Sequence, residues 1–137
     1  MTTTVTPKLA IIGLGRMGGN MLRRLARAGL AVSGFDTDAA ARELLMGVAA
    51  INVAESLQQA IARLGAPRIV WIMLPAGDIT EQAIAAAAAQ LSPGDIIVDG
   101  GNADYRDSVR RAGELARHPR RPSWSAIGCF TKRVVSI

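Results

Sequence analysis

The sequence of 137 residues is poor in the residue types that build disulfides, metal sites and aromatic clusters. It has one cysteine, Cys129, and one histidine, His118, so it can form neither an intrachain disulfide nor a multi-cysteine zinc site. No apolar run approaches the roughly 20 residues of a membrane-spanning helix, and the Thr-rich start lacks the pattern of a secretory signal. We therefore expect a cytoplasmic protein with no membrane partner.

Positive charge is concentrated near the carboxyl end of the chain. The formal net charge is +5, but residues 118–137 contain four cations and no acid. Residues 1–117 hold the remaining twelve cations and eleven acids and are nearly neutral. The basic segment shows no known nucleic-acid-binding pattern, so the charge does not indicate a nucleic-acid partner.

Hydrophobic patterning predicts strands that alternate with helices. Short apolar runs indicate strands at 8–13, 31–36, 49–53, 68–74 and 95–99. Segments of helical period follow them at roughly 16–28, 38–46, 56–64, 78–91 and 104–117. Gly29 is placed to end the first helix, and Asp78 with Glu81 resembles a capping box at the start of the fourth. The alternation predicts an α/β fold, a Rossmann-type doubly wound parallel sheet.

The pattern breaks down after residue 117. We expect one domain over residues 1–117, followed by an irregular, divergent, basic tail at 118–137. Within that tail, the run 125–130 allows either a sixth strand or a disordered end.

A glycine-rich turn, GLGRMG, joins the first predicted strand to the first predicted helix. Gly13 permits the sharp turn, Gly15 lets a pyrophosphate approach the backbone, and Gly18 lets the helix pack close to the strand. The helix N-terminus adds unpaired N–H groups and a partial positive charge. This context predicts dinucleotide binding, with a purely structural turn as the alternative. Arg16 is expected either to contact the pyrophosphate or to be solvated.

Asp36 ends the second predicted strand. A carboxylate at this point can accept hydrogen bonds from both hydroxyls of an adenosine ribose, and it repels a 2′-phosphate. Thr37, Asp38 and Ala39 add no cation that would attract such a phosphate. We therefore expect NAD as the cofactor, with NADP less favoured. The alternative is that Asp36 only caps the following helix.

Two further loops follow predicted strands at the edge of the sheet where a cofactor binds. The first, LPAG at 74–77, combines a rigid proline with small residues that leave room for a ligand. The second, DGGN at 99–102, allows close backbone approach and presents the amide of Asn102. Strand termination and helix capping are the alternative interpretations of these loops.

Together these segments resemble the coenzyme domain of the 6-phosphogluconate dehydrogenases, and in particular its shorter, NAD-preferring bacterial branch. The resemblance covers residues 8–117 and rests on GLGRMGGNM, Asp36, WIMLPAG at 71–77 and DGGNADYRDS at 99–108. The cofactor-binding residues that it implies are Gly13, Leu14, Gly15, Arg16, Met17, Gly18, Asp36, Leu74, Pro75, Ala76 and Asn102.

The resemblance also implies a reaction. The family oxidises 6-phosphogluconate with NAD or NADP and decarboxylates it to ribulose 5-phosphate and CO2, so a sugar-phosphate acid is the implied substrate, contacted by Asn102. The related 3-hydroxyisobutyrate-type dehydrogenases share the glycine turn and the LP loop, but they usually carry Ser-Thr where this chain has Gly101-Asn102. A non-catalytic nucleotide-binding module is the other alternative.

After His118 the chain departs from the family pattern. The substrate loop, the lysine base and the glutamate acid of the family have no match there, so no catalytic residue is assigned, Lys132 included. We expect the chain to be inactive alone, and to expose apolar surface that favours self-association into a homo-oligomer or poor solubility. Truncation, a frameshifted end and genuine divergence all remain open interpretations of the tail.

Overall fold

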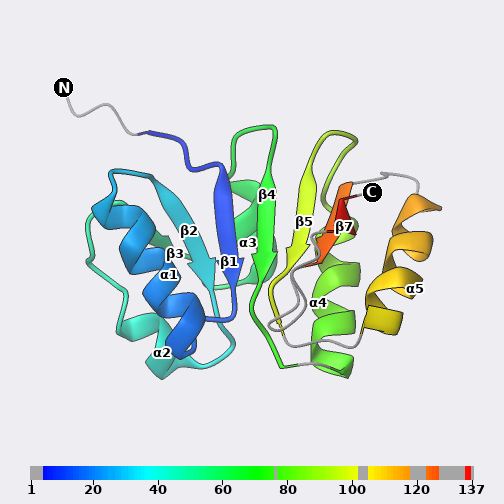
Figure 1. Cartoon of the computed structure of the whole chain (residues 1–137). Coiled ribbons are helices and arrows are strands. Elements are labelled where there is room, and N and C mark those ends of the chain that lie inside the picture. Colours follow the sequence, from blue (N-terminus) through cyan, green and yellow to red (C-terminus); the bar gives the residue numbers. More distant parts are fainter. Residues whose placement is uncertain (1–4, 76, 102–104, 118–122, 127–134, 137) are drawn as a thin grey trace.

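The computed structural model contains a sheet with helices on both faces (Figure 1). It describes residues 5–75, 77–101, 105–117, 123–126 and 135–136. The strands are β1 (Leu9–Ile12), β2 (Val32–Phe35), β3 (Ile51–Val53), β4 (Ile69–Ile72), β5 (Ile96–Asp99), β6 (Ser123–Ala126) and β7 (Val135–Ser136). The helices are α1 (Arg16–Arg27), α2 (Ala39–Glu43), α3 (Leu57–Ala62), α4 (Asp78–Ala88) and α5 (Tyr105–Ala116).

The strand order across the sheet is β3-β2-β1-β4-β5-β6-β7. All neighbouring pairs from β3 to β6 are parallel, and β7 runs antiparallel to β6. The chain winds outward from β1 in one direction and from β4 in the other, which is the doubly wound arrangement. The α/β fold predicted from the alternation of strands and helices is confirmed.

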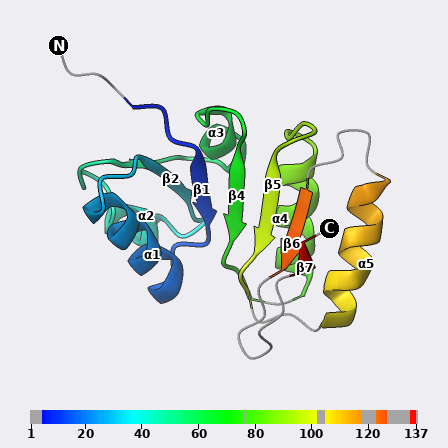
Figure 2. The ribbon, with the colours of Figure 1, turned by 45° about the horizontal axis from the view of Figure 1, so that its top comes forward.

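The two faces of the sheet bury separate apolar clusters. One face packs against α3, α4 and α5, and the other packs against α1 and α2 (Figure 2). Ala10 and Ile12 of β1 belong to the first cluster, whereas Ile11 between them belongs to the second. Because side chains alternate along a strand, burial on both faces requires an unbroken apolar run. This is why the strand signal in the sequence is continuous rather than alternating.

The helices begin close to the predicted positions, but several end earlier. α2 ends at Glu43 and α4 at Ala88, each three residues before its predicted end. Gly29 directly follows the C-cap of α1 with a φ of +87°, which confirms its predicted role as a helix stop. None of the helices in the described part of the chain combines the length and apolar character that crossing a membrane requires.

The region after residue 117 adds strands to the sheet. β6 pairs in parallel with β5, and two residues of β7 pair with β6. β6 begins two residues before the predicted run 125–130 and overlaps it at Ser125 and Ala126, so these two residues agree with the strand alternative. Residues 127–130 of that run lie outside the described residues.

The predicted capping box at the start of α4 is wrong. Gly77 precedes the helix with a φ of +114°, and its N-terminus has no side-chain cap. Glu81 instead pairs with Arg110 and Arg111 on α5. Charge-assisted pairing with two guanidinium groups is stronger than a hydrogen bond to one backbone N–H, so the tertiary contact overrides the local pattern.

A buried carboxylate joins β4 and β5 at their amino ends. Asp95 is only 3% exposed, and it accepts hydrogen bonds from the backbone N–H and Nε of Arg68 at 2.8 and 2.9 Å and from the backbone N–H of Ser92 at 2.8 Å. Burial alone would raise the pKa of Asp95. The hydrogen bonds and the charge of Arg68 outweigh burial, and they hold the pKa below its ordinary value.

Asp95→Asn should therefore change how stability depends on pH. Because the pKa of Asp95 is lower in the folded state than in the unfolded state, its ionised carboxylate stabilises the fold at pH values above the unfolded-state pKa. This stabilisation is lost as the pH falls through the folded-state pKa. We expect the variant to be less stable at pH 7 by about 1–3 kcal/mol, and to lose less stability than the parent on acidification below about pH 4. Urea unfolding at a series of pH values measures both effects.

Glu43→Gln, which alters an exposed acid away from any helix N-terminus, is the matched control and should stay within about 0.5 kcal/mol of the parent across the same pH series. An Asp95→Asn protein with the same acid dependence as the parent would contradict the assignment.

Candidate dinucleotide-binding site

The segments singled out in the sequence meet at one edge of the sheet. The glycine turn follows β1, Asp36 follows β2, Leu74-Pro75 follows β4 and Gly100-Gly101 follows β5. Because β2, β1, β4 and β5 are parallel neighbours in that order, their carboxyl ends lie side by side. The topology thus builds one continuous site from four loops.

The three glycines of the turn occupy three different environments. Gly13 has a φ of +99°, and a Cβ there would lie 2.4 Å from the carbonyl oxygen of Met73. A Cβ on Gly18 would lie 1.9 Å from the carbonyl oxygen of Gly13. A Cβ on Gly15 would meet no atom within 4 Å. Gly13 and Gly18 are therefore required by the fold, whereas Gly15 leaves open space that a ligand can enter.

The N-terminus of α1 is open to an anion. Its N-cap is Gly15, no side chain caps it, and its first turn contains no acidic residue. The first N–H groups of a helix have no intrahelical acceptor, so these groups can donate to a phosphate. Arg16 and Met17 in this turn are both exposed. The turn and the helix start thus fit the pyrophosphate of a dinucleotide.

Asp36 is tied to the glycine turn by its carboxylate. The backbone N–H of Leu14 donates to Asp36 Oδ2 at 2.7 Å, and the backbone N–H of Asp38 donates to Oδ1 at 2.8 Å. The cap of α2 is Asp38, which accepts a hydrogen bond from Ala40 N–H. The alternative that Asp36 only caps the next helix is therefore wrong, because Asp38 is the cap and Asp36 joins the end of β2 to the turn after β1.

Leu74 lies between the glycine turn and the loop after β5. A Cβ on Gly13 would lie 3.0 Å from Leu74 Cδ2, and a Cβ on Gly101 would lie 2.6 Å from the Leu74 carbonyl oxygen. The next residue, Pro75, is exposed, and its carbonyl accepts a hydrogen bond of 2.7 Å from the buried hydroxyl of Thr80. The candidate residues Ala76 and Asn102 lie outside the described residues.

Sequence reasoning missed two residues that shape this site. Thr80 fixes the loop after β4 from within α4. Arg42 on α2 donates through Nη1 to the carbonyl oxygens of Asp36 at 2.7 Å and Thr37 at 3.3 Å. A cation does therefore approach the end of β2, although none is adjacent to Asp36 in sequence. The helical spacing of Arg42 from the Asp38 cap was the available signal.

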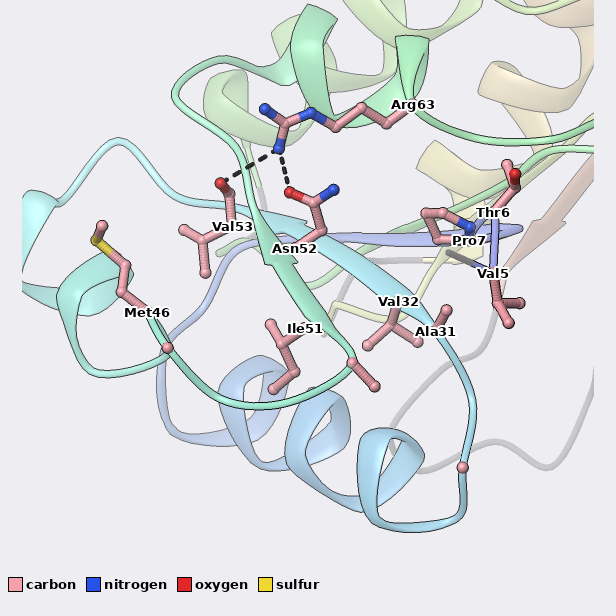
Figure 3. A pocket seen from close by; sticks show the side chains of 13 residues that line it. Val5, Thr6, Pro7, Ala31, Val32, Met46, Ile51, Asn52, Val53 and Arg63 are labelled. Atoms are coloured by element: carbon pink, nitrogen blue, oxygen red, sulfur yellow. Dashed lines mark hydrogen bonds between the residues drawn. The ribbon is translucent and has the colours of Figure 1, made fainter. Parts of the chain in front are cut away.

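Two cavities lie at opposite ends of the strands, and only the smaller one borders the glycine turn. One of about 260 Å³ lies between the glycine turn and α2, and its lining includes Gly15, Arg16 and Asp38. Another of about 750 Å³ lies along the amino ends of β1 and β2 and beside β3 (Figure 3). Its charged residue, Arg63, is held by the side chain of Asn52 and the carbonyl of Val53. The larger cavity is thus removed from the helix N-terminus and the glycine turn.

The fold and the open glycine turn define a dinucleotide-binding domain of the Rossmann type. A model of the NAD binding domain of 6-phosphogluconate dehydrogenase matches residues 8–121. The chain belongs to this family.

Individual relatives agree with the family model. The chain is 38% identical over 105 residues to the NAD(+)-dependent, decarboxylating 6-phosphogluconate dehydrogenase of Haloferax volcanii, a match that covers 77% of this chain and 35% of that enzyme. A structure of Plasmodium falciparum 6-phosphogluconate dehydrogenase, described in complexes with NADP+ and with 6-phosphogluconate, superimposes with a TM-score of 0.79 at 25% identity. That superposition covers 88% of this chain and 27% of the Plasmodium chain.

The fold is shared more widely. Mycobacterium tuberculosis 3-hydroxyisobutyrate dehydrogenase superimposes with a TM-score of 0.74 at 24% identity, over 90% of this chain and 41% of that one. The chain therefore shares its fold with a 3-hydroxyisobutyrate dehydrogenase, the enzyme class that the sequence left open as an alternative. The chain spans about a third of the length of the Haloferax relative.

Substituting two of the glycines should separate folding from binding. Gly18→Ala places a methyl group against a backbone carbonyl that cannot move freely, and it should destabilise the protein by about 3 kcal/mol, at the upper end of overpacking costs. Gly15→Ala meets open space and should cost less than about 1 kcal/mol. Urea unfolding of both variants measures the difference. Equal destabilisation would show that the two glycines do not have the distinct roles assigned to them.

Proposed function

We propose that this chain binds NAD at the glycine turn and serves as the coenzyme-binding part of a decarboxylating 6-phosphogluconate dehydrogenase. The observation that carries the proposal is the open backbone at Gly15, set between the N-terminus of α1 and the carboxylate of Asp36. The family membership of the chain supports the same function. The expected cellular location is the cytoplasm.

The described residues suit the successive parts of the dinucleotide. The N–H groups at the start of α1 would hold the pyrophosphate beside Gly15, and Asp36 would accept hydrogen bonds from the adenosine ribose. β4 lies on the opposite side of β1 from β2, so the nicotinamide would lie toward Leu74, Pro75 and the loop after β5. Bound NAD would supply the hydride acceptor for oxidation of a hydroxyl group.

NAD is proposed as the cofactor in preference to NADP. A 2′-phosphate would lie against the carboxylate of Asp36, where two like charges repel each other at short range. Arg42 offers the opposing attraction, but its Nη1 already donates to two backbone carbonyls at the end of β2. We therefore weigh the carboxylate above the guanidinium group.

Calorimetric titration with both cofactors tests this preference. We expect the parent chain to bind NAD about tenfold more tightly than NADP, which corresponds to about 1.4 kcal/mol. Asp36→Asn removes the charge that repels a 2′-phosphate, so it should narrow the gap to about twofold. Its single amide oxygen can accept from only one of the N–H groups of Leu14 and Asp38, so NAD affinity itself should also fall. Gly15→Val should abolish binding of both cofactors in a folded protein, because its side chain occupies the pyrophosphate position.

Arg27→Ala removes an exposed cation at the end of α1 farthest from the glycine turn; it is the control and should change NAD affinity by less than about twofold. A parent chain that prefers NADP, with that preference lost in Arg42→Ala, would overturn the proposal and identify Arg42 as the residue that recognises the 2′-phosphate.

The proposed substrate of the whole enzyme is 6-phosphogluconate, a sugar-phosphate acid, with Asn102 as its contact in this chain. Oxidation also requires a base for the hydroxyl proton and an acid for the enediol that follows decarboxylation, and we assign neither role to a residue of this chain. Binding and orientation of the cofactor are therefore the functions proposed for the described residues.

The 137-residue chain alone should form NADH from saturating 6-phosphogluconate and NAD at close to the background rate. A positioned general base contributes roughly 10²–10⁴ in rate, and precise placement of the substrate contributes more. NADH absorbance follows the reaction. Robust turnover that Asn102→Ala abolishes would show that this chain supplies catalytic groups beyond those assigned.

A further inference from the structure

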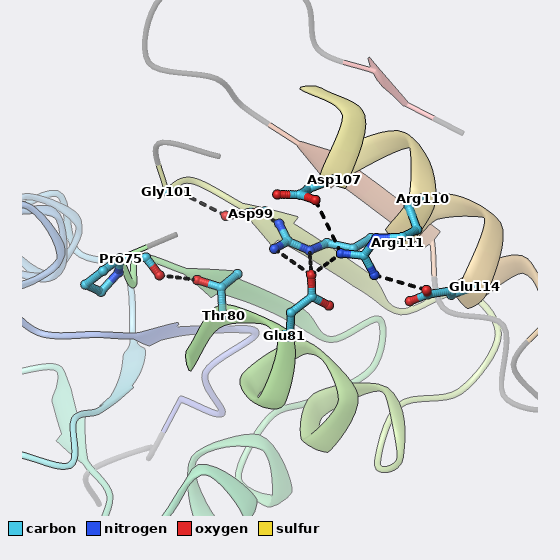
Figure 4. A network of polar contacts seen from close by, with 9 residues as sticks. All are labelled: Pro75, Thr80, Glu81, Asp99, Gly101, Asp107, Arg110, Arg111 and Glu114. Atoms are coloured by element: carbon cyan, nitrogen blue, oxygen red, sulfur yellow. Dashed lines mark hydrogen bonds and ion pairs between the residues drawn. The ribbon is translucent and has the colours of Figure 1, made fainter. Parts of the chain in front are cut away.

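A buried charge network lies behind the loop that follows β5 (Figure 4). Arg111 of α5 is 1% exposed and donates through Nη1 to Asp99 Oδ2 at 2.8 Å, and Asp99, the last residue of β5, is 2% exposed. Arg111 Nε also donates to Glu81 Oε1 of α4 at 2.9 Å. One guanidinium group thus joins α4, β5 and α5.

The network extends directly to the loop backbone. Asp99 Oδ1 accepts a hydrogen bond from the backbone N–H of Gly101 at 3.0 Å, while its other oxygen is held by Arg111. Gly101 in turn lies against the carbonyl of Leu74, where a Cβ would come within 2.6 Å. The position of this loop beside Leu74 therefore depends on the carboxylate of Asp99, which Arg111 holds by a hydrogen bond to its other oxygen.

Stability alone explains this network poorly. A buried ion pair must repay the desolvation of both charges, and apolar replacements of similar size are often as stable. Burial indeed raises the pKa of Asp99, despite the hydrogen bond from Gly101 and the charge of Arg111. Arg111 Nη2 is buried and has no hydrogen-bond partner among the described residues, although it lies 2.9 Å from Glu81 Oε1. A planar guanidinium group that donates in fixed directions to two carboxylates is better suited to fixing orientation.

We propose that Arg111 is a positioning residue that, through Asp99, orients the Gly100–Gly101 loop for contact with the nicotinamide half of the bound dinucleotide. This inference rests on the proposed function, since strand order places that half beside β4 and β5 and the adenosine half beside β2. Disturbing the network should therefore weaken contacts to one half of the cofactor only.

Arg111→Lys tests the inference without leaving the charge of Asp99 unpaired. A lysine ammonium retains the positive charge but lacks the planar fork that reaches Asp99 and Glu81 together. Calorimetry compares NAD with ADP-ribose, which has the adenosine, pyrophosphate and second ribose but no nicotinamide. We expect NAD affinity to fall about five- to tenfold in the variant, while ADP-ribose affinity changes by less than about twofold.

Arg110→Lys is the matched control. Arg110 is the neighbouring, exposed residue, and it contacts Glu81 but makes no contact with Asp99. Both affinities should stay within about twofold of the parent values. If Arg111→Lys fails to fold, Glu81→Gln is measured by the same comparison, because it removes the carboxylate that holds the other side of the guanidinium group.

The outcomes separate this inference from the proposed function. A parent chain that binds neither ligand overturns the proposed function and the inference with it. Three other outcomes overturn the inference and leave dinucleotide binding intact. In the first, the parent chain binds NAD and ADP-ribose equally well. In the second, a folded variant loses affinity for both ligands in equal measure, and in the third it loses affinity for neither.

Discussion

The close approach of α1 to the end of β1 sets the geometry of the whole cofactor edge. With a hypothetical Gly18 Cβ only 1.9 Å from the Gly13 carbonyl, no other residue type fits without displacing the backbone. This contact fixes the position of the α1 N-terminus at the carboxyl ends of the strands. Leu14, held by its N–H to the Asp36 carboxylate, then fixes the turn relative to β2. The anion-binding position and the ribose-binding position are thus set by the same few backbone contacts.

Polar groups divide into two sets across the sheet. At the amino ends of β4 and β5, Asp95 and Arg68 join the strands in a way that requires no ligand. At the carboxyl ends, Asp36 and Asp99 each hold a loop by a backbone N–H, and both loops face the proposed cofactor. The first set stabilises the scaffold, and the second shapes the site.

The fold was predictable because its signals are local. Three of these signals involve only residues that are neighbours in the sequence. They are the unbroken apolar run of β1, the three glycines of the G-x-G-x-x-G turn and the helix stop at Gly29. Asp36 was also identified, since its place at the end of a strand follows from the motif. The capping box at Asp78 failed because Glu81 pairs with residues of α5 that are 29 and 30 positions away. Arg111 was missed for the same reason, because its partners Asp99 and Glu81 are 12 and 30 positions away. Arg42 and Thr80 contact loop carbonyls only five or six positions away, but the conformation of those loops does not follow from periodicity.

Backbone amide NMR shifts during titration with NAD test most directly whether a dinucleotide binds at the glycine turn. We expect the largest shift changes at the N–H groups of Gly15, Arg16 and Met17, with smaller changes near Asp36 and Gly101, and little change at Arg68 and Asp95. Changes confined to the cavity beside β3, or no change at the glycine turn at saturating NAD, would contradict this expectation.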